Sequence, residues 1–205
     1  LERFRLVPKG DWRELNDPEA LGGVLYDFAP HLVDQALDLM GPVVSVNAHA
    51  RTVREIPVSD DDLLIMLQHE SGGISYLVGS LATALPGPRF TLAGTTGALR
   101  INDVDTQEKH LKLGVTPGDG WGVESDESLV EIWSSDAAGE LTRTTLPCET
   151  GNWPEYYREV LAFLTESVLP TVTLDQAVAT TRVIDAARIS VANGEVVRLE
   201  PPASH

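Results

Sequence analysis

The chain has 205 residues, 42% of them hydrophobic, which is enough for one compact core and predicts a single domain over residues 1–205. It carries 15 Lys and Arg against 31 Asp and Glu, and the resulting net charge of −16 argues against a nucleic-acid partner or an anionic membrane surface. Cys148 is the only cysteine, which excludes an intrachain disulfide and a cysteine-rich metal site, and we expect a cytoplasmic location.

The first residues indicate a piece of a longer protein. The chain starts at Leu1 rather than Met and opens with a charged, strand-like stretch over residues 2–6. Neither a signal peptide nor a membrane anchor is visible. We therefore expect a chain that begins inside a longer protein or has been processed.

Residues 22–40 have the hydrophobic spacing of a helix. The apolar stripe consists of Leu25, Phe28, Ala29, Leu32, Val33, Ala36, Leu37 and Met40. The opposite face carries Asp27, His31, Asp34 and Asp38. Because a proline inside a helix removes a hydrogen bond, Pro30 predicts a break between Asp27 and Pro30. Either the main helix starts there with Pro30 in its first turn, or a short preceding turn is kinked against it.

The middle of the chain alternates apolar and polar residues, which is typical of strands. Gly, Pro and Asp separate these stretches, and few helices interrupt them, so antiparallel pairing should dominate. A short helix over residues 103–113 and a polar loop over 117–127 are expected between the fifth and sixth strands. The predicted strands cover residues 43–54, 62–70, 73–81, 89–96, 98–103, 128–133 and 141–146.

After Asn152 the spacing becomes helical again. Pro170 separates two predicted helices, and Gly194 suits a C-cap before a last strand over residues 196–199. The first stripe is Tyr156, Tyr157, Val160, Leu161 and Leu164, and the second is Leu174, Ala177, Val178, Thr181 and Ile184. The pattern predicts an α+β fold: an open, largely antiparallel sheet with helices packed on one face.

Asp27 and His31 are the sharpest chemical signal. An acid and a histidine four residues apart share a helix face, and together they make an acid/base couple. Two other interpretations stay open: a solvated polar face of an amphipathic helix, or a divalent metal held by Asp27, His31 and Asp34. A break at Pro30 also weakens the strict i, i+4 geometry.

The residues around this pair resemble a known family. A paired glycine, Gly22 and Gly23, precedes the Asp-x3-His element, and the likeness continues through RFTLAGTTGALRIND, GNWPEYY and the closing VANGEVVRL. Over nearly its whole length the chain resembles the C-terminal domain of the glucose-fructose oxidoreductase, inositol dehydrogenase and MocA family. Within that family it is similar to the sugar and scyllo-inositol dehydrogenases. The resemblance implies a fold like the C-terminal domain of glyceraldehyde-3-phosphate dehydrogenase.

The resemblance also implies a function. The chain would be the substrate-binding and dimerisation domain of an NAD- or NADP-dependent oxidoreductase that exchanges hydride with a hydroxyl carbon of a sugar or cyclitol. His31 would be the general base, and Asp27 would orient the imidazole or hydrogen-bond a substrate hydroxyl. The family's Glu-Lys-Pro lysine and its nucleotide-binding domain are absent here. The alternative is a non-catalytic binding or dimerisation module that keeps the fold.

The remaining candidates are weaker. Trp12, Asn152 and Tyr156 have polar tips that could face a polyol, although core packing explains such aromatics equally well. No Gly-x-Gly-x-x-Gly follows a strand, and GDGWG at 118–122 is interpreted as a turn. We therefore expect neither a bound cofactor nor activity from this chain alone, and the family resemblance requires no metal. His49 and His69 are interpreted as surface or sheet-face residues.

A homodimer through the sheet is the expected assembly. Helices are sufficient for only one face, and the hairpin over residues 62–80 has apolar side chains on both faces. An uncovered apolar face normally meets a partner, and a two-fold dimer is the commonest closed assembly. Relatives in the resembled family commonly pair in this way.

Overall fold

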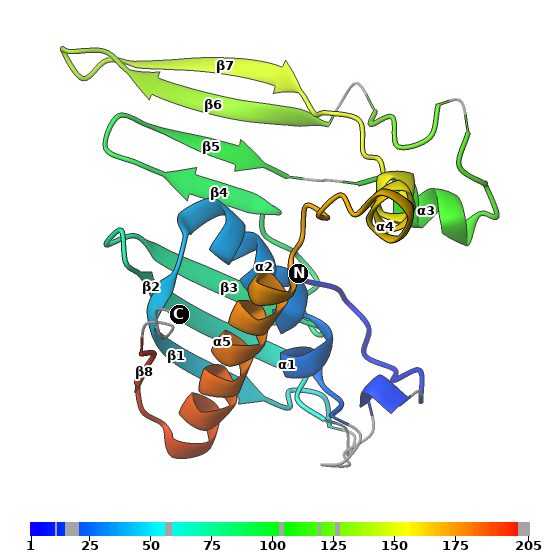
Figure 1. Ribbon diagram of the computed structural model, residues 1–205. Helices are drawn as coiled ribbons and strands as arrows, with labels where there is room; N and C mark the ends of the chain where they lie inside the picture. Colours follow the sequence, from blue (N-terminus) through cyan, green and yellow to red (C-terminus); the bar gives the residue numbers. More distant parts are fainter. Residues whose placement is uncertain are drawn as a thin grey trace. The chain divides into compact units, whose positions relative to one another are not determined.

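The structure is a computed structural model that describes residues 1–10, 12–14, 21–55, 59–102, 105–118, 120–125 and 128–200. By their internal contacts the described residues form two compact units, Leu1–Pro86 with Val172–His205, and Gly87–Thr171. The single domain expected over residues 1–205 stays a prediction. In chain order (Figure 1) the elements are η1 (Trp12–Glu14), α1 (Val24–Asp27), α2 (Ala29–Met40), β1 (Val43–Arg51), β2 (Asp62–His69), β3 (Ile74–Ser80), β4 (Phe90–Ala93), β5 (Gly97–Ile101), α3 (Gln107–Lys112), β6 (Leu129–Ser135), β7 (Leu141–Pro147), α4 (Pro154–Glu166), α5 (Leu174–Asn193) and β8 (Val197–Arg198).

The first unit is a four-stranded antiparallel sheet in the order β3-β2-β1-β8, with helices α1, α2 and α5 on one face (Figure 1). The core lies between them and includes the inward side chains of β2, Leu63, Ile65 and Leu67. The chain's first residues bridge to the end of this sheet, Glu2 to Ser80 and Phe4 to Ala82. The strand-like start expected over residues 2–6 therefore reaches the sheet only through isolated bridges.

The predicted helix break is confirmed. Helix α1 ends at Asp27 and α2 begins at Ala29, with Pro30 in its first turn, where the missing N–H costs no helical hydrogen bond. The predicted apolar stripe faces the core: Leu25, Phe28, Ala29, Leu32, Val33 and Ala36 are buried. Asp27 and His31 lie on the opposite, solvent-facing side of the junction.

Helix α5 ends as the sequence predicts but turns a different stripe inward. Thr173 and Gln176 form a capping box at its start, and Gly194 closes it in the left-handed conformation with φ +71°. Leu174 and Val178, expected to be apolar contacts, are exposed. Of the predicted stripe only Ile184 is buried, and Ser190 accepts a hydrogen bond from the Ala48 N–H of β1. The buried residues of α5 begin at its seventh position: Thr180, Val183, Ile184, Ala186, Ala187 and Ser190.

The second unit contains a separate antiparallel sheet in the order β4-β5-β6-β7, followed by α4. The predicted strands therefore form two four-stranded sheets. Pro86 and Pro88 lie between β3 and β4, and because proline lacks an N–H they stop strand pairing there. The antiparallel α+β class is confirmed. Within the described residues, no helix combines the length and apolar composition that crossing a membrane requires.

Gln107 connects three loops of this second unit. Its side-chain oxygen accepts hydrogen bonds from the Trp121 indole and the Trp153 backbone N–H, each at 2.7 Å, and its amide nitrogen donates to Asp105. The predicted short helix thus exists as α3, although residues 103 and 104 of the predicted range lie outside the described residues. None of the α4 residues in the predicted stripe is buried.

Candidate functional site

Asp27 and His31 sit on either side of the α1–α2 junction. Asp27 is the last residue of α1, and His31 is in the first turn of α2. The Asp27 carboxylate is partly exposed and the His31 ring is exposed. Among the described residues no hydrogen bond or ion pair joins these two side chains. The break at Pro30 therefore leaves His31 open to solvent for proton exchange, while Asp27 takes a different partner.

That partner is Arg13, which the sequence analysis missed. The Arg13 Nε lies 3.3 Å from Asp27 Oδ1, and its guanidinium lies over the Trp12 ring at 4.6 Å from the ring centre. The Gly23 N–H donates to the Arg13 carbonyl at 2.6 Å, which fixes the backbone of η1 against the start of α1. Trp12, whose residue is 56% exposed, is thereby brought to the same region as Asp27. An exposed aromatic ring beside a cation and a carboxylate is well suited to hold a polyhydroxylated ligand.

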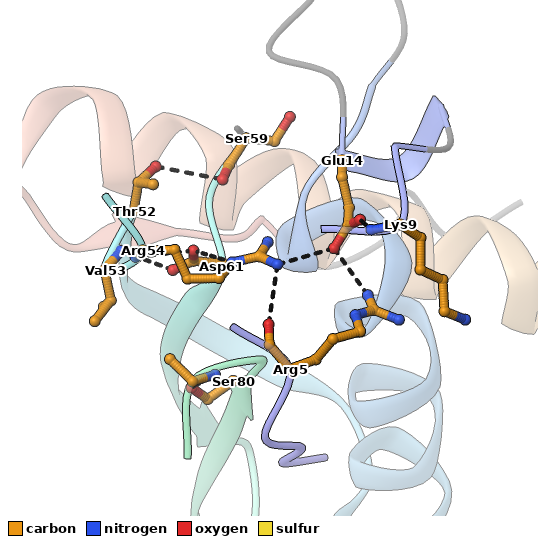
Figure 2. A network of polar contacts seen from close by, with 10 residues as sticks. Arg5, Lys9, Glu14, Thr52, Val53, Arg54, Ser59, Asp61 and Ser80 are labelled. Carbon is orange, nitrogen blue, oxygen red and sulfur yellow. Dashed lines mark hydrogen bonds and ion pairs between the residues drawn. The ribbon is translucent and has the colours of Figure 1, made fainter. Parts of the chain in front are cut away.

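A buried ionic network, defined as Glu14, Arg54, Asp61 and Arg5, lies behind this turn (Figure 2). The Arg54 guanidinium donates to Asp61 Oδ2 at 2.7 Å and to Glu14 Oε1 at 3.0 Å. Arg5 donates to the same Glu14 oxygen at 2.9 Å. The side chains of Arg54, Glu14 and Asp61 are only 2%, 4% and 0% exposed. Buried charges of this kind are tolerated only when closely paired and hydrogen-bonded.

The pKa values follow from these contacts. Burial alone would raise the pKa of Glu14, but the hydrogen bonds from Arg54 and the Lys9 N–H, with the nearby Arg5 charge, outweigh it and hold that pKa below 4.5. Burial disfavours the charged form of Arg54, yet its hydrogen bonds to Asp61 and Glu14 raise its pKa above the ordinary value. Glu14 and Arg54 are therefore both charged at neutral pH.

Asp60 holds the N-terminus of α1. Its Oδ2 accepts the Leu25 N–H at 2.8 Å, and its carbonyl accepts the Val24 N–H at 2.9 Å. Gly23 is required here because its φ is +96° and a Cβ would lie 2.2 Å from Asp60 Oδ1. Burial is the main cause that raises the pKa of the Asp60 carboxyl, and the neighbouring Asp61 charge adds to it.

The other sequence candidates, Asn152 and Tyr156, belong to the second unit. The Asn152 amide donates to Glu155 at 3.2 Å, and Tyr156 is 66% exposed with its ring edge-on to Tyr157. Core packing, the alternative for these aromatics, therefore does not occur at Tyr156. Trp12, Asp27 and His31 belong to the first unit, where Arg13 contacts both the Trp12 ring and the Asp27 carboxylate.

One of the two histidines interpreted as surface or sheet-face residues is buried. His49 is exposed on β1, as predicted, but His69 is 1% exposed. Its two ring nitrogens meet the Gly41 carbonyl at 2.7 Å and the Ser75 hydroxyl at 2.8 Å. It follows the buried residues of β2 in the alternation, a signal from which its burial could have been read. His69 is thus a structural residue of the core face.

Asp34 and the GDGWG segment are the remaining candidates from the sequence for a metal or a nucleotide. Asp34 accepts a hydrogen bond from Thr180 at 3.4 Å, and in the part of the chain that is described no group of three His, Cys, Asp or Glu side chains could hold a metal ion. In GDGWG, where Asp119 lies outside the described residues, Trp121 N–H bonds to the Gly118 carbonyl, and Gly122 lies against the Gly151 backbone. The described residues of this segment thus make backbone contacts of a turn.

A family model described as "Oxidoreductase family, C-terminal alpha/beta domain" matches residues 2–199. The chain belongs to this family of glucose-fructose oxidoreductase, inositol dehydrogenase and MocA. The resemblance inferred from the sequence is confirmed.

Individual relatives agree. The chain is 29% identical to scyllo-inositol 2-dehydrogenase (NADP(+)) IolW of Bacillus subtilis over 97% of this chain and 54% of that protein. It is 30% identical to the uncharacterized oxidoreductase C26H5.09c of Schizosaccharomyces pombe over 91% of this chain and 54% of that protein. The solved structure of YPO2259 from Yersinia pestis covers 98% of the chain, and the chain covers 55% of it, with 27% identity and a TM-score of 0.87. The chain thus spans about half the length of these relatives.

Proposed function

We propose that this chain is the substrate-binding part of an NAD- or NADP-dependent oxidoreductase that exchanges hydride with a hydroxyl carbon of a sugar or cyclitol. The observation that carries the proposal is the group of Asp27, His31, Arg13 and Trp12 at the α1–α2 junction. The relative named for scyllo-inositol and NADP(+) supports this substrate class.

The proposed chemistry gives His31 the proton. Oxidation of a carbinol removes a hydride from carbon and a proton from oxygen, and a nicotinamide cofactor, when bound, takes the hydride. The exposed His31 imidazole takes the hydroxyl proton as general base. Asp27, fixed by Arg13, accepts a hydrogen bond from a neighbouring hydroxyl, and the Trp12 ring covers an apolar face of the ligand. Because no Gly-x-Gly-x-x-Gly follows a strand in this sequence, none of its residues is assigned to the cofactor, and the choice between NAD and NADP stays open.

The test is turnover by the full-length protein that contains this chain. Sugars and inositols are screened with NAD⁺ and NADP⁺, and the preferred substrate is then used with His31→Ala. Loss of the base should lower kcat by about a hundredfold or more. Asp38→Ala is the control, since Asp38 is an exposed residue farther along α2. Asp27→Asn should raise KM, with the exposed Asp38→Asn as its control.

The outcomes separate the two functions under consideration. Near-wild-type kcat in His31→Ala would remove the acid/base role. Absence of turnover with every sugar and cyclitol tested, combined with saturable binding of one of them, would favour the non-catalytic binding module instead.

We further propose that the chain forms a homodimer through the open face of the first sheet. The outer side chains of β2 and β3 pair across the strands, Leu64 with Val78 and Met66 with Tyr76, and Ile74 continues the row. Sedimentation should show a dimer at micromolar concentration and a monomer for Tyr76→Lys. Leu85→Lys, at a highly exposed leucine outside this row, is the control and should remain dimeric. A wild-type monomer at high micromolar concentration would contradict the proposal.

A further inference from the structure

The buried ionic network contains three charged side chains that are almost completely removed from water, and one of them, Glu14, is adjacent in sequence to Arg13 of the candidate site. Taking three charged side chains out of water is expensive, and replacing such groups by apolar ones is often neutral or stabilising. Stability alone is therefore a weak explanation for Glu14, Arg54 and Asp61. Their positions in the chain suggest another explanation, because Glu14 comes from η1, whereas Arg54 follows β1 and Asp61 immediately precedes β2.

Glu14 is the one buried residue of η1. Its Oε1 accepts from Arg5 and Arg54, its Oε2 accepts the Lys9 N–H, and its carbonyl accepts the Ser59 N–H at 3.3 Å. The side chain and the backbone carbonyl of Glu14 are thus both held by hydrogen bonds. Figure 2 shows the carboxylate reaching toward the Arg54 and Arg5 guanidinium groups.

The neighbouring residue extends the other way. Arg13 directs its side chain to Asp27, and its carbonyl receives the Gly23 N–H. Within one turn, Glu14 anchors η1 to the buried network and Arg13 contacts the candidate site. Movement of Glu14 therefore moves the group that fixes the Asp27 carboxylate.

We propose that Glu14, held by Arg54, is a positioning residue for the candidate acid/base pair and acts through the Arg13–Asp27 ion pair. The proposal rests on the proposed function for its effect on turnover. Glu14 touches neither substrate nor reacting atoms. Its charge keeps η1 in place, so that Asp27 presents its second carboxylate oxygen to a substrate hydroxyl while His31 transfers the proton.

The first test is a split between KM and kcat in the full-length protein. Glu14→Gln should raise KM about tenfold, the scale of one lost charge-assisted hydrogen bond, and leave the pH dependence of kcat in place because His31 is untouched. Arg13→Gln should do the same. The double variant should be no worse than Arg13→Gln alone, since both changes break one chain of contacts. Asp62→Asn is the control, because its pair with Arg51 is exposed and leads away from η1.

The second test needs no turnover. Hydrogen exchange of the Gly23 N–H, which donates to the Arg13 carbonyl, should quicken at least tenfold in Glu14→Gln and stay unchanged in Asp62→Asn. If Glu14→Gln fails to fold, Arg5→Gln removes one partner from the same Glu14 oxygen at a partly exposed position and should show a smaller quickening. A wild-type protein inactive on every polyol would defeat the proposed function, and hydrogen exchange would then decide this proposal alone. Unchanged exchange at Gly23, or additive effects in the double variant, would overturn it.

Discussion

Replacing Arg54 by methionine should destabilise the first unit far more than the same change at Arg51. Arg54→Met leaves the Glu14 and Asp61 carboxylates buried and without their shared guanidinium, a loss that typically costs about 3–5 kcal/mol. Glu14 keeps Arg5, and Asp61 keeps the Val53 N–H at 2.7 Å, so we expect the lower end, about 3 kcal/mol. Arg51 makes an ion pair of the same length, 2.7 Å, but its side chain is 75% exposed. Arg51→Met should therefore cost less than about 1 kcal/mol.

Urea unfolding at pH 7, followed by far-ultraviolet circular dichroism, measures both variants. With a slope of about 2 kcal/mol per molar, Arg54→Met should shift the midpoint by about 1.5 M. Because the folded pKa of Glu14 lies below its ordinary 4.5, Glu14 stabilises the wild type above pH 4.5, and this contribution disappears as the pH falls through the folded value. The difference in free energy of unfolding between wild type and Arg54→Met should therefore become smaller as the pH is lowered. Equal costs for the two arginines, or a gap that widens in acid, would refute the reasoning.

Three further predictions follow, two from the same region and one from the absence of a Gly-x-Gly-x-x-Gly motif after a strand in this sequence. Gly23→Ala should lower the urea midpoint more than Gly72→Ala. Both glycines have positive φ, which costs alanine about 1–2 kcal/mol, but only at Gly23 would the Cβ also meet a neighbour, Asp60 Oδ1 at 2.2 Å. Equal midpoint shifts would contradict this prediction. Asp60→Asn should be more stable than wild type at pH 7. Because the pKa of Asp60 is raised in the folded state, the free energy of unfolding of the wild type declines as the pH rises through that folded-state pKa, and the neutral asparagine avoids this decline. A variant that is less stable than wild type at every pH would count against this prediction. Titration of this chain alone with NADH or NADPH should give no saturable fluorescence change, and micromolar binding would reveal a nucleotide site in it.

Local patterns predicted the elements well because the forces behind them are local. The missing N–H of Pro30 acts within one helical turn, and the break between α1 and α2 falls where the sequence placed it. The alternation in β2 records which side faces the core, and it extends to His69. The α5 stripe was misplaced because burial there depends on where β1 and α2 lie, which the spacing of one helix does not contain.

The supporting residues of the candidate site escaped prediction for a related reason. The Arg54 and Glu14 partners are 40 residues apart, and the Leu25 and Asp60 partners are 35 apart. No periodicity relates such distant positions, and charged residues in a sequence usually indicate exposure to solvent. Asp27 and His31 could be proposed from the sequence because an acid and a histidine lie only four residues apart. Arg13, which pairs with Asp27, was found only when the chain was folded.

Three consecutive aspartates at the start of β2 show how one short segment can govern the candidate site. Asp62 pairs with the exposed Arg51 and can be lost at little cost. Asp61 bonds Arg54, which holds Glu14 and so fixes the turn that carries Arg13. Asp60 accepts the first N–H groups of α1, the helix that ends at Asp27. Both partners of the Arg13–Asp27 pair therefore depend on two adjacent residues, Asp60 and Asp61, that immediately precede β2.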